Sequence, residues 1–258
     1  MIRRSFASAV LAASVVCASL LAVPAQAQSD TKVFRFVPHA NLAVLDPIWT
    51  TAYVTRNHAY MVYDTLFSED AQGNIKPQMV DTHTVSGDKK TWTFKLRSGL
   101  EFHDGKPVTS ADVVASLKRW ASRDAMGGVL NTFIDRYETP SADTFRMVLK
   151  EPCGIVLDAL GKASSNVPFI MPERIANTPG TEQIKESIGS GPFIFKADEF
   201  QPGVKVVYVR NPKYKARNEP SSAMAGGRQV NFDRVEWVII RDPQTQFNAL
   251  KAGEVDMV

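Results

Sequence analysis

The chain has 258 residues, of which 44% are hydrophobic and 9% aromatic, a composition typical of a globular protein with a sizeable core. Its 30 basic and 27 acidic residues give a formal net charge of only +3 at pH 7, and no run of lysines and arginines occurs. This balance argues against nucleic acid as a partner and against electrostatic adhesion to a membrane surface.

The first 27 residues have the layout of a secretory signal peptide. Arg3 and Arg4 precede an apolar run over residues 7–23, and Ala25 and Ala27 supply the small residues that signal peptidase needs. The run is short for crossing about 30 Å of hydrocarbon, which disfavours a membrane anchor. We therefore expect cleavage after Ala27 and export to the periplasm.

The two cysteines do not change this interpretation. Lipidation at Cys17 is an alternative to cleavage, but Val16 stands where a small residue is normally needed. After cleavage Cys153 is the only cysteine, so the mature chain is expected to be stabilised by its hydrophobic core without an intrachain disulfide.

The segments up to residue 97 predict a strand, a helix and a second strand. Residues 33–37 form a short β-prone run. Residues 57–67 carry three aromatic residues at helical spacing, which predicts a helix with one aromatic face on the core. Over residues 92–97 apolar and polar side chains alternate without a break, which is typical of a strand with one buried face.

A second helix is predicted to begin at Thr109, because its hydroxyl and the Asp112 carboxylate can satisfy the free amides of a first turn. The buried side of this helix is expected to carry the apolar residues Val113, Leu117, Trp120 and Ala121. Ser116, Lys118 and Arg119 are expected to face elsewhere.

The second half continues the mixture of strands and helices. The patterns predict a strand over 145–149, a short helix over 155–160, a hairpin of 193–195 with 204–209, a strand over 235–240, and a helix over 244–251 ended by Gly253. A further strand begins at Val255, and since the sequence stops inside it, we expect the chain to be a fragment. Strands interleaved with helices predict an α/β protein.

No established catalytic or metal-binding motif occurs. Ser190 lies between two glycines but is followed by a proline that disfavours the helix of a nucleophile elbow. His103 and Asp104 are adjacent in a turn, where side chains usually face different ways, and a buried inert thiol is the simplest interpretation of Cys153. The four histidines lack the spacing of metal ligands. No catalytic residue, metal or cofactor is therefore expected.

Seven short segments occur in an order that is shared with one known family. They are Leu45-Asp46-Pro47, Tyr63-Asp64-Thr65-Leu66, the run from Trp92 to Pro107, Ala111-Asp112-Val113, Gly189-Ser190-Gly191-Pro192-Phe193, Asn211-Pro212-Lys213-Tyr214 and Ala252-Gly253-Glu254-Val255-Asp256. Together they resemble the family 5 extracellular solute-binding proteins, the dipeptide and oligopeptide binders of ABC importers. Most of these segments are expected to be scaffold. The strand that begins at Trp92 packs in the core, the turn around Asp104 redirects the chain, and the Gly-Ser-Gly-Pro loop lets two stretches of backbone approach closely.

The resemblance implies a type II periplasmic-binding-protein fold, α/β and two-lobed, of which this chain holds mainly the first lobe. We expect a signal peptide over 1–27 and lobe I over 28–258. Within lobe I, a base of about 28–67 plus 187–258 would carry an inserted subdomain of about 68–186. The second lobe and the return to the first would be missing.

The resemblance also implies a non-enzymatic, monomeric receptor that captures a di- or oligopeptide and delivers it to the permease subunits of an inner-membrane ABC transporter. By position, His39, Asn41 and Leu42 would lie near the cleft, with the stretch around Asn131 and Phe133 as a second candidate. Nickel chelates, haem, glutathione and oligosaccharides remain alternative ligands within the family. Alternatives of other classes are a secreted hydrolase that uses Ser190 or Cys153, and an adhesion or chaperone module.

Overall fold

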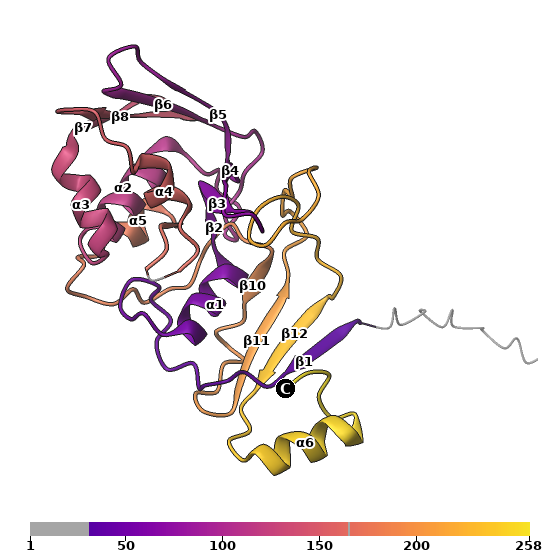
Figure 1. Ribbon diagram of the computed structural model, residues 1–258. Coiled ribbons are helices and arrows are strands. Elements are labelled where there is room, and N and C mark those ends of the chain that lie inside the picture. The colour runs from indigo at the N-terminus through magenta and orange to yellow at the C-terminus, as the bar shows by residue number, and fades with distance from the viewer. Residues whose placement is uncertain (1–30, 165) are drawn as a thin grey trace, which may run out of the picture. The chain divides into compact units, whose positions relative to one another are not determined.

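The computed structural model describes residues 31–164 and 166–258 (Figure 1). The predicted signal peptide lies outside the described residues. The helices are α1 Tyr53–Val62, α2 Ser110–Ala121, α3 Ala125–Phe133, α4 Val156–Gly161, α5 Glu173–Ala176 and α6 Pro243–Ala252. The strands are β1 Val33–Phe36, β2 Asp64–Thr65, β3 Phe67–Glu69, β4 Ile75–Pro77, β5 Val80–Val85, β6 Thr91–Leu96, β7 Ile134–Ser141, β8 Thr144–Leu149, β9 Phe169–Ile170, β10 Phe193–Phe195, β11 Lys205–Arg210 and β12 Arg234–Val238. Over the described ranges, no helix is long and apolar enough to cross a membrane.

The first large sheet has the strand order β1-β12-β11-β10. β10 and β11 pair antiparallel, which confirms the predicted hairpin, whereas β1 runs parallel to β12 with Phe36 opposite Trp237. Helix α1 lies against this sheet (Figure 1). Because side chains alternate along a strand, Phe34 and Phe36 share the face of the sheet that packs toward α1.

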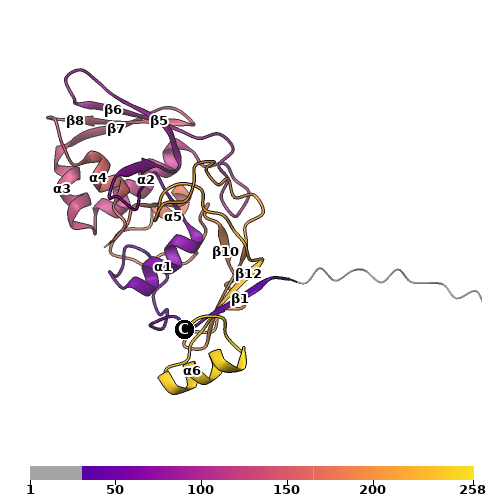
Figure 2. The same cartoon turned by 45° about the vertical axis from the view of Figure 1, so that its right-hand side comes forward.

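The second large sheet, β5-β6-β8-β7, is antiparallel throughout. The predicted strand over 92–97 is its inner strand β6, and Phe94 stacks on Phe145 of β8 with ring centroids 4.8 Å apart. Leu117 and Trp120 of α2 belong to the same apolar cluster. Figure 2 shows α2, α3 and α4 gathered on one side of this sheet.

Two large hydrophobic clusters hold most of the buried apolar side chains, and a small third cluster of Val37, Ala249 and Val255 lies beside β1 and α6. The first is drawn from Ile48 and from residues 66–170, and it lies between the second sheet and helices α2, α3 and α4. The second is drawn from residues 42–63, Ala115 and residues 167–237, and it lies between α1 and the first sheet.

Helix α6 and the segment after it add to the first sheet. Asp242 caps the helix by accepting a hydrogen bond from the Thr245 backbone N–H at 2.7 Å, and Gly253 ends it in the left-handed conformation with φ 73°, as predicted. The Val37 backbone N–H then donates to the Met257 carbonyl at 2.9 Å. The residues after Gly253 therefore lie alongside β1.

The prediction of a helix over 57–67 is wrong at both ends, since α1 begins at Tyr53 and ends at Val62. At its carboxyl end the Gly191 backbone N–H donates to the Val62 carbonyl at 2.9 Å, and Tyr63 leaves the helix with extended backbone angles. Asp64 and Thr65 then pair with β9. Backbone partners more than 100 residues away thus override a local periodicity that continues to Phe67.

The expected outward positions of Ser116 and Arg119 on α2 are also wrong. The capping interaction of Asp112 with the Thr109 N–H is present at 2.8 Å, but Ser116 is 3% exposed and Arg119 only 5%. The Arg119 guanidinium donates to both carboxylate oxygens of Asp46, at 3.0 and 2.7 Å, and to the carbonyls of Thr178 and Glu182. The segment around 178–184 covers this side of α2, which periodicity alone does not reveal.

His103 joins two of the segments that carry the family resemblance. Its backbone N–H donates to the Gly189 carbonyl at 2.8 Å, and its ring Nε2 lies 3.1 Å from the Gly191 carbonyl. The Gly189 N–H points to the other ring nitrogen, Nδ1, at 3.4 Å. This pattern suits a neutral imidazole that donates from Nε2 and accepts at Nδ1.

Acid is expected to destabilise the protein partly through this ring. Burial lowers the pKa of His103 from its usual 6.5 to about 4. Between these two values the unfolded chain binds the proton and the folded chain does not, so stability falls as the pH drops through this window. His58, whose pKa burial lowers to about 3, adds to the same trend.

Unfolding by urea at a series of pH values checks this expectation. His103→Gln is expected to make the loss of stability between about pH 6.5 and about pH 4 shallower. The unaltered chain, measured over the same pH range, supplies the reference slope. Equal slopes for His103→Gln and the unaltered chain would show that the His103 ring does not remain neutral on folding.

Candidate functional site

Helix α1 presents a mixed polar and aromatic face opposite its most buried residues, and two members of this face, Tyr60 and Met61, also pack against the second hydrophobic cluster. Val54, His58, Ala59 and Val62 are buried against the sheet. The residues at the intervening positions, Tyr53, Arg56, Asn57, Tyr60 and Met61, are exposed or half-buried. The 3.6-residue period of a helix places them together along one side. This α1 face therefore combines a cation, an amide and aromatic rings.

An apolar groove lies beside the α1 face. It has a volume of about 380 Å³ and takes its lining from β1, α1, β10, the segment before β12, β12 itself and the segment after α6. The lining residues are Phe34, Phe36, Asn57, Met61, Phe193, Gln229, Val230, Asn231, Phe232, Val235, Trp237 and Met257. Phe232, 37% exposed, stacks on Phe34 at 4.9 Å. The groove is thus mainly apolar, with five aromatic rings, and three amides are its polar groups.

Arg56 does not line this groove, but it contacts Asn57, which does. One of its terminal nitrogens, Nη2, donates to Oδ1 of Asn57, a groove residue, at 3.4 Å, and the other, Nη1, donates to the Ser164 hydroxyl at 3.2 Å. The guanidinium also lies 4.4 Å from the centre of the Tyr53 ring, a cation–π contact. All of these partners are uncharged.

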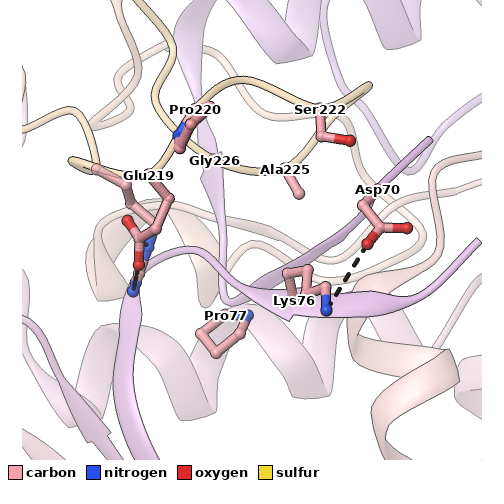
Figure 3. A pocket seen from close by; sticks show the side chains of 9 residues that line it. Asp70, Lys76, Pro77, Glu219, Pro220, Ser222, Ala225 and Gly226 are labelled. Atoms are coloured by element: carbon pink, nitrogen blue, oxygen red, sulfur yellow. Dashed lines mark hydrogen bonds and ion pairs between the residues drawn. The ribbon is translucent and has the colours of Figure 1, made fainter. Parts of the chain in front are cut away.

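A second cavity, of about 290 Å³, lies between β4 and the loop around residue 220 (Figure 3). Its charged groups already pair with one another: Lys76 lies 3.7 Å from Asp70, and Arg217 lies 2.7 Å from Glu219. Asp70 also accepts from the backbone N–H groups of Gln72 and Asn74. These ion pairs hold the loop in place, so the cavity offers a ligand fewer free polar groups than the groove does.

The residues predicted after the first strand lie outside the groove. His39 and Asn41 are exposed, and Asn41 Oδ1 accepts from the Gly203 N–H at 3.1 Å. Leu42 is fully buried in the second hydrophobic cluster, so its side chain packs in the core.

The second predicted stretch lies on α3. Asn131 is exposed, and Phe133 is half-buried against the first hydrophobic cluster. Leu42 and Phe133 thus pack into different clusters, and none of the five predicted residues lines the groove.

The sequence reasoning missed the α1 face. A signal was available, because Tyr53, Arg56, Asn57, Tyr60 and Met61 repeat at helical spacing. Starting the helix at Asn57 left the first two of these residues outside it. No local sequence pattern indicates the groove, because the aromatic residues that its strands contribute are also typical of a buried core.

The residues considered for catalysis are not arranged as a nucleophile and its base. The Ser190 hydroxyl is buried and has no hydrogen-bond partner among the described residues, while both ring nitrogens of the nearby His103 face backbone groups. Cys153 is a buried free thiol. Within the described ranges, no group of three or more His, Cys, Asp or Glu residues is placed to hold a metal.

Comparisons with known proteins agree on one family. The model for the middle region of the bacterial extracellular solute-binding proteins, family 5, matches residues 74–258. A probable peptide ABC transporter periplasmic-binding protein of Sinorhizobium fredii is 45% identical over 95% of this chain and 47% of its own length. The chain therefore spans about half the length of this relative.

Solved structures agree on the fold. The binding protein AgaA of A. tumefaciens R10, solved with agropinic acid, superposes with a TM-score of 0.67 at 28% identity, over 86% of this chain and 43% of its own. NikA of Brucella suis, solved with Fe(III)-EDTA, gives a TM-score of 0.70 at 25% identity, over 86% of this chain and 42% of its own. These likenesses confirm the predicted α/β fold of the type II periplasmic binding proteins.

Proposed function

The chain belongs to family 5 of the bacterial extracellular solute-binding proteins, and we propose that it forms one wall of the ligand cleft of a peptide receptor. The observation that carries this proposal is the apolar groove beside the α1 face, with its amide groups. The 45% identical relative, named as a probable peptide-binding protein, supports a peptide as the ligand.

The chemistry of the groove suits a peptide. Ligand sites of this kind are mostly apolar, with a few polar groups that fix orientation. The rings of Phe34, Phe232 and Trp237 offer contact to an apolar side chain. The amides of Asn57 and Gln229 each provide a donor and an acceptor for peptide groups. His39 and Asn41 remain candidates for the rim of the cleft, as do Asn131 and Phe133, whereas Leu42 would act through its backbone.

Family membership supports a wider proposal. We propose a periplasmic, monomeric receptor that delivers its ligand to the permease subunits of an ABC transporter and performs no chemistry itself. Among the described residues no base reaches the Ser190 hydroxyl, which supports a receptor over a hydrolase. We also propose the division into a base and an inserted subdomain. The two hydrophobic clusters support it, although residues 167–184 contribute to the cluster of the base.

The chain by itself is expected to bind peptides weakly. Intact sites bury about 70–90% of a ligand's surface, and a single wall leaves much of it in water. Closure of two lobes, which would select the bound state, also requires both lobes. We therefore expect dissociation constants above about 1 μM for any dipeptide.

Calorimetry on the chain checks this expectation with the dipeptide Ala-Leu, reduced glutathione and a nickel–EDTA chelate. Weak binding of Ala-Leu that exceeds binding of the other two is the expected result. A dissociation constant below about 1 μM would contradict the account of a single wall. Preference for the nickel chelate would overturn the assignment to peptides.

A further inference from the structure

We infer that the guanidinium of Arg56 binds a carboxylate of the ligand while the adjoining groove takes an apolar group, so that this wall selects apolar organic acids with a free carboxylate. The inference rests on the proposed function, because it assigns a chemical class to the ligand of the same site.

The first observation is that Arg56 has no acidic partner in the described parts of the chain. A guanidinium carries five N–H donors, and Arg56 uses two hydrogen bonds, both to neutral oxygens. Its Nε is shielded from solvent and has no partner among the described residues. A shielded cation without a counter-charge is costly, and a carboxylate that accepts from it would offset that cost.

Other shielded arginines are compensated. Arg119 pairs with Asp46, Arg228 with Asp64 and Arg234 with Glu199. Arg97 pairs with no carboxylate in the described ranges but donates to the backbone carbonyls of Gln78 and Lys215. Arg56 instead contacts an amide, a hydroxyl and an aromatic ring, which leaves its charge available to a ligand.

The second observation is the position of this charge relative to the groove. Asn57 both lines the groove and accepts from Arg56, so the guanidinium lies one side chain from the groove wall. The ring of Tyr53, which is 59% exposed, supports the guanidinium from one side. A ligand whose apolar group enters the groove would thereby bring a nearby carboxylate to Arg56.

The test compares two probes that differ only in charge at the carboxyl end, Ala-Leu and Ala-Leu amide. The ¹H–¹⁵N signal of the Arg56 Nε–H, assigned by its loss in Arg56→Lys, reports on the guanidinium. The methyl signal of Met61 reports on the groove. We expect both signals to shift with Ala-Leu, and we expect the acid to bind about tenfold more tightly than the amide.

Two variants complete the test. Arg56→Gln is expected to bring the two probes to equal affinity. Arg35→Gln is the control, because it also removes one positive charge, in this case from β1. The Arg35 side chain lies on the face of the sheet opposite to Phe34 and Phe36, so this variant should keep the preference for the acid.

The outcomes separate the inference from the proposed function. If the Met61 signal shifts equally with both probes in the unaltered chain, the groove binds ligand but the role of Arg56 is overturned. If neither probe shifts Met61, the site itself is wrong and the inference falls with it.

Discussion

Replacing Arg119 with alanine is expected to lower the free energy of unfolding by about 3–5 kcal/mol, because it leaves the carboxylate of Asp46 buried without its counter-charge. The side chains of both partners are almost completely shielded from solvent, at 2% and 0% exposed. Arg119 also donates to the carbonyls of Thr178 and Glu182, so the segment of Asp46 and the segment around 178–184 lose a shared partner. Urea unfolding followed by tryptophan fluorescence measures the loss.

The matched control is Arg136→Ala. Arg136 is 57% exposed and pairs with Asp135 and Glu138 at the surface, where ion pairs contribute about 0–1 kcal/mol. A loss for Arg119→Ala no larger than that of the control would contradict the buried ion pair. Replacing both Asp46 and Arg119 with leucine is expected to cost less than the two single losses together, because neither charge is then left unpaired.

The change Gly191→Ala is expected to cost about 1–3 kcal/mol through overpacking against backbone. A Cβ at this position would lie 2.7 Å from both the carbonyl carbon and the carbonyl oxygen of Val62, and 2.8 Å from the Tyr63 carbonyl oxygen. These are backbone atoms at the end of α1 and cannot rotate away as a side chain would. The helix end must shift, which also disturbs the α1 face.

Gly87→Ala serves as the control for this substitution. Gly87 lies in the turn between β5 and β6, and a Cβ there would meet no atom within 4 Å. We expect the change to alter stability by less than about 0.5 kcal/mol. Denaturant titrations of the two variants give the comparison, and equal stability of Gly191→Ala and Gly87→Ala would contradict the close approach of the Gly-Ser-Gly-Pro loop to α1.

The sequence predicts elements well where the signal is local. The alternation in β6, the capping residues of α2 and the glycine after α6 each specify a structure within a few residues, and all three are confirmed. The predicted close approach at the Gly-Ser-Gly-Pro loop is confirmed too. The errors occur where distant segments decide: the pairing of β2 with β9 ends α1 early, and Asp46 holds Arg119 in the interior.

The candidate site was harder to predict for the same reason. Its walls come from β1 and α1 on one hand and from β10 and residues 229–237 on the other, and more than 100 residues of chain separate these two groups. The aromatic residues of β1 and β12 alternate as core residues do, so nothing local indicates that part of their surface borders a groove. Arg56 and Arg119 both lie on helices, and their different partners and burial come from segments distant in the sequence.

Methyl NMR of methionine tests the location of the ligand wall most directly. Met61 and Met257 line the groove, Met126 lies on α3 near the second predicted stretch, and Met79 and Met147 are buried in the first hydrophobic cluster. On titration with Ala-Leu, we expect shifts for Met61 and Met257 and none for Met79 or Met147. Shifts confined to Met126, with Met61 and Met257 unchanged, would contradict this expectation.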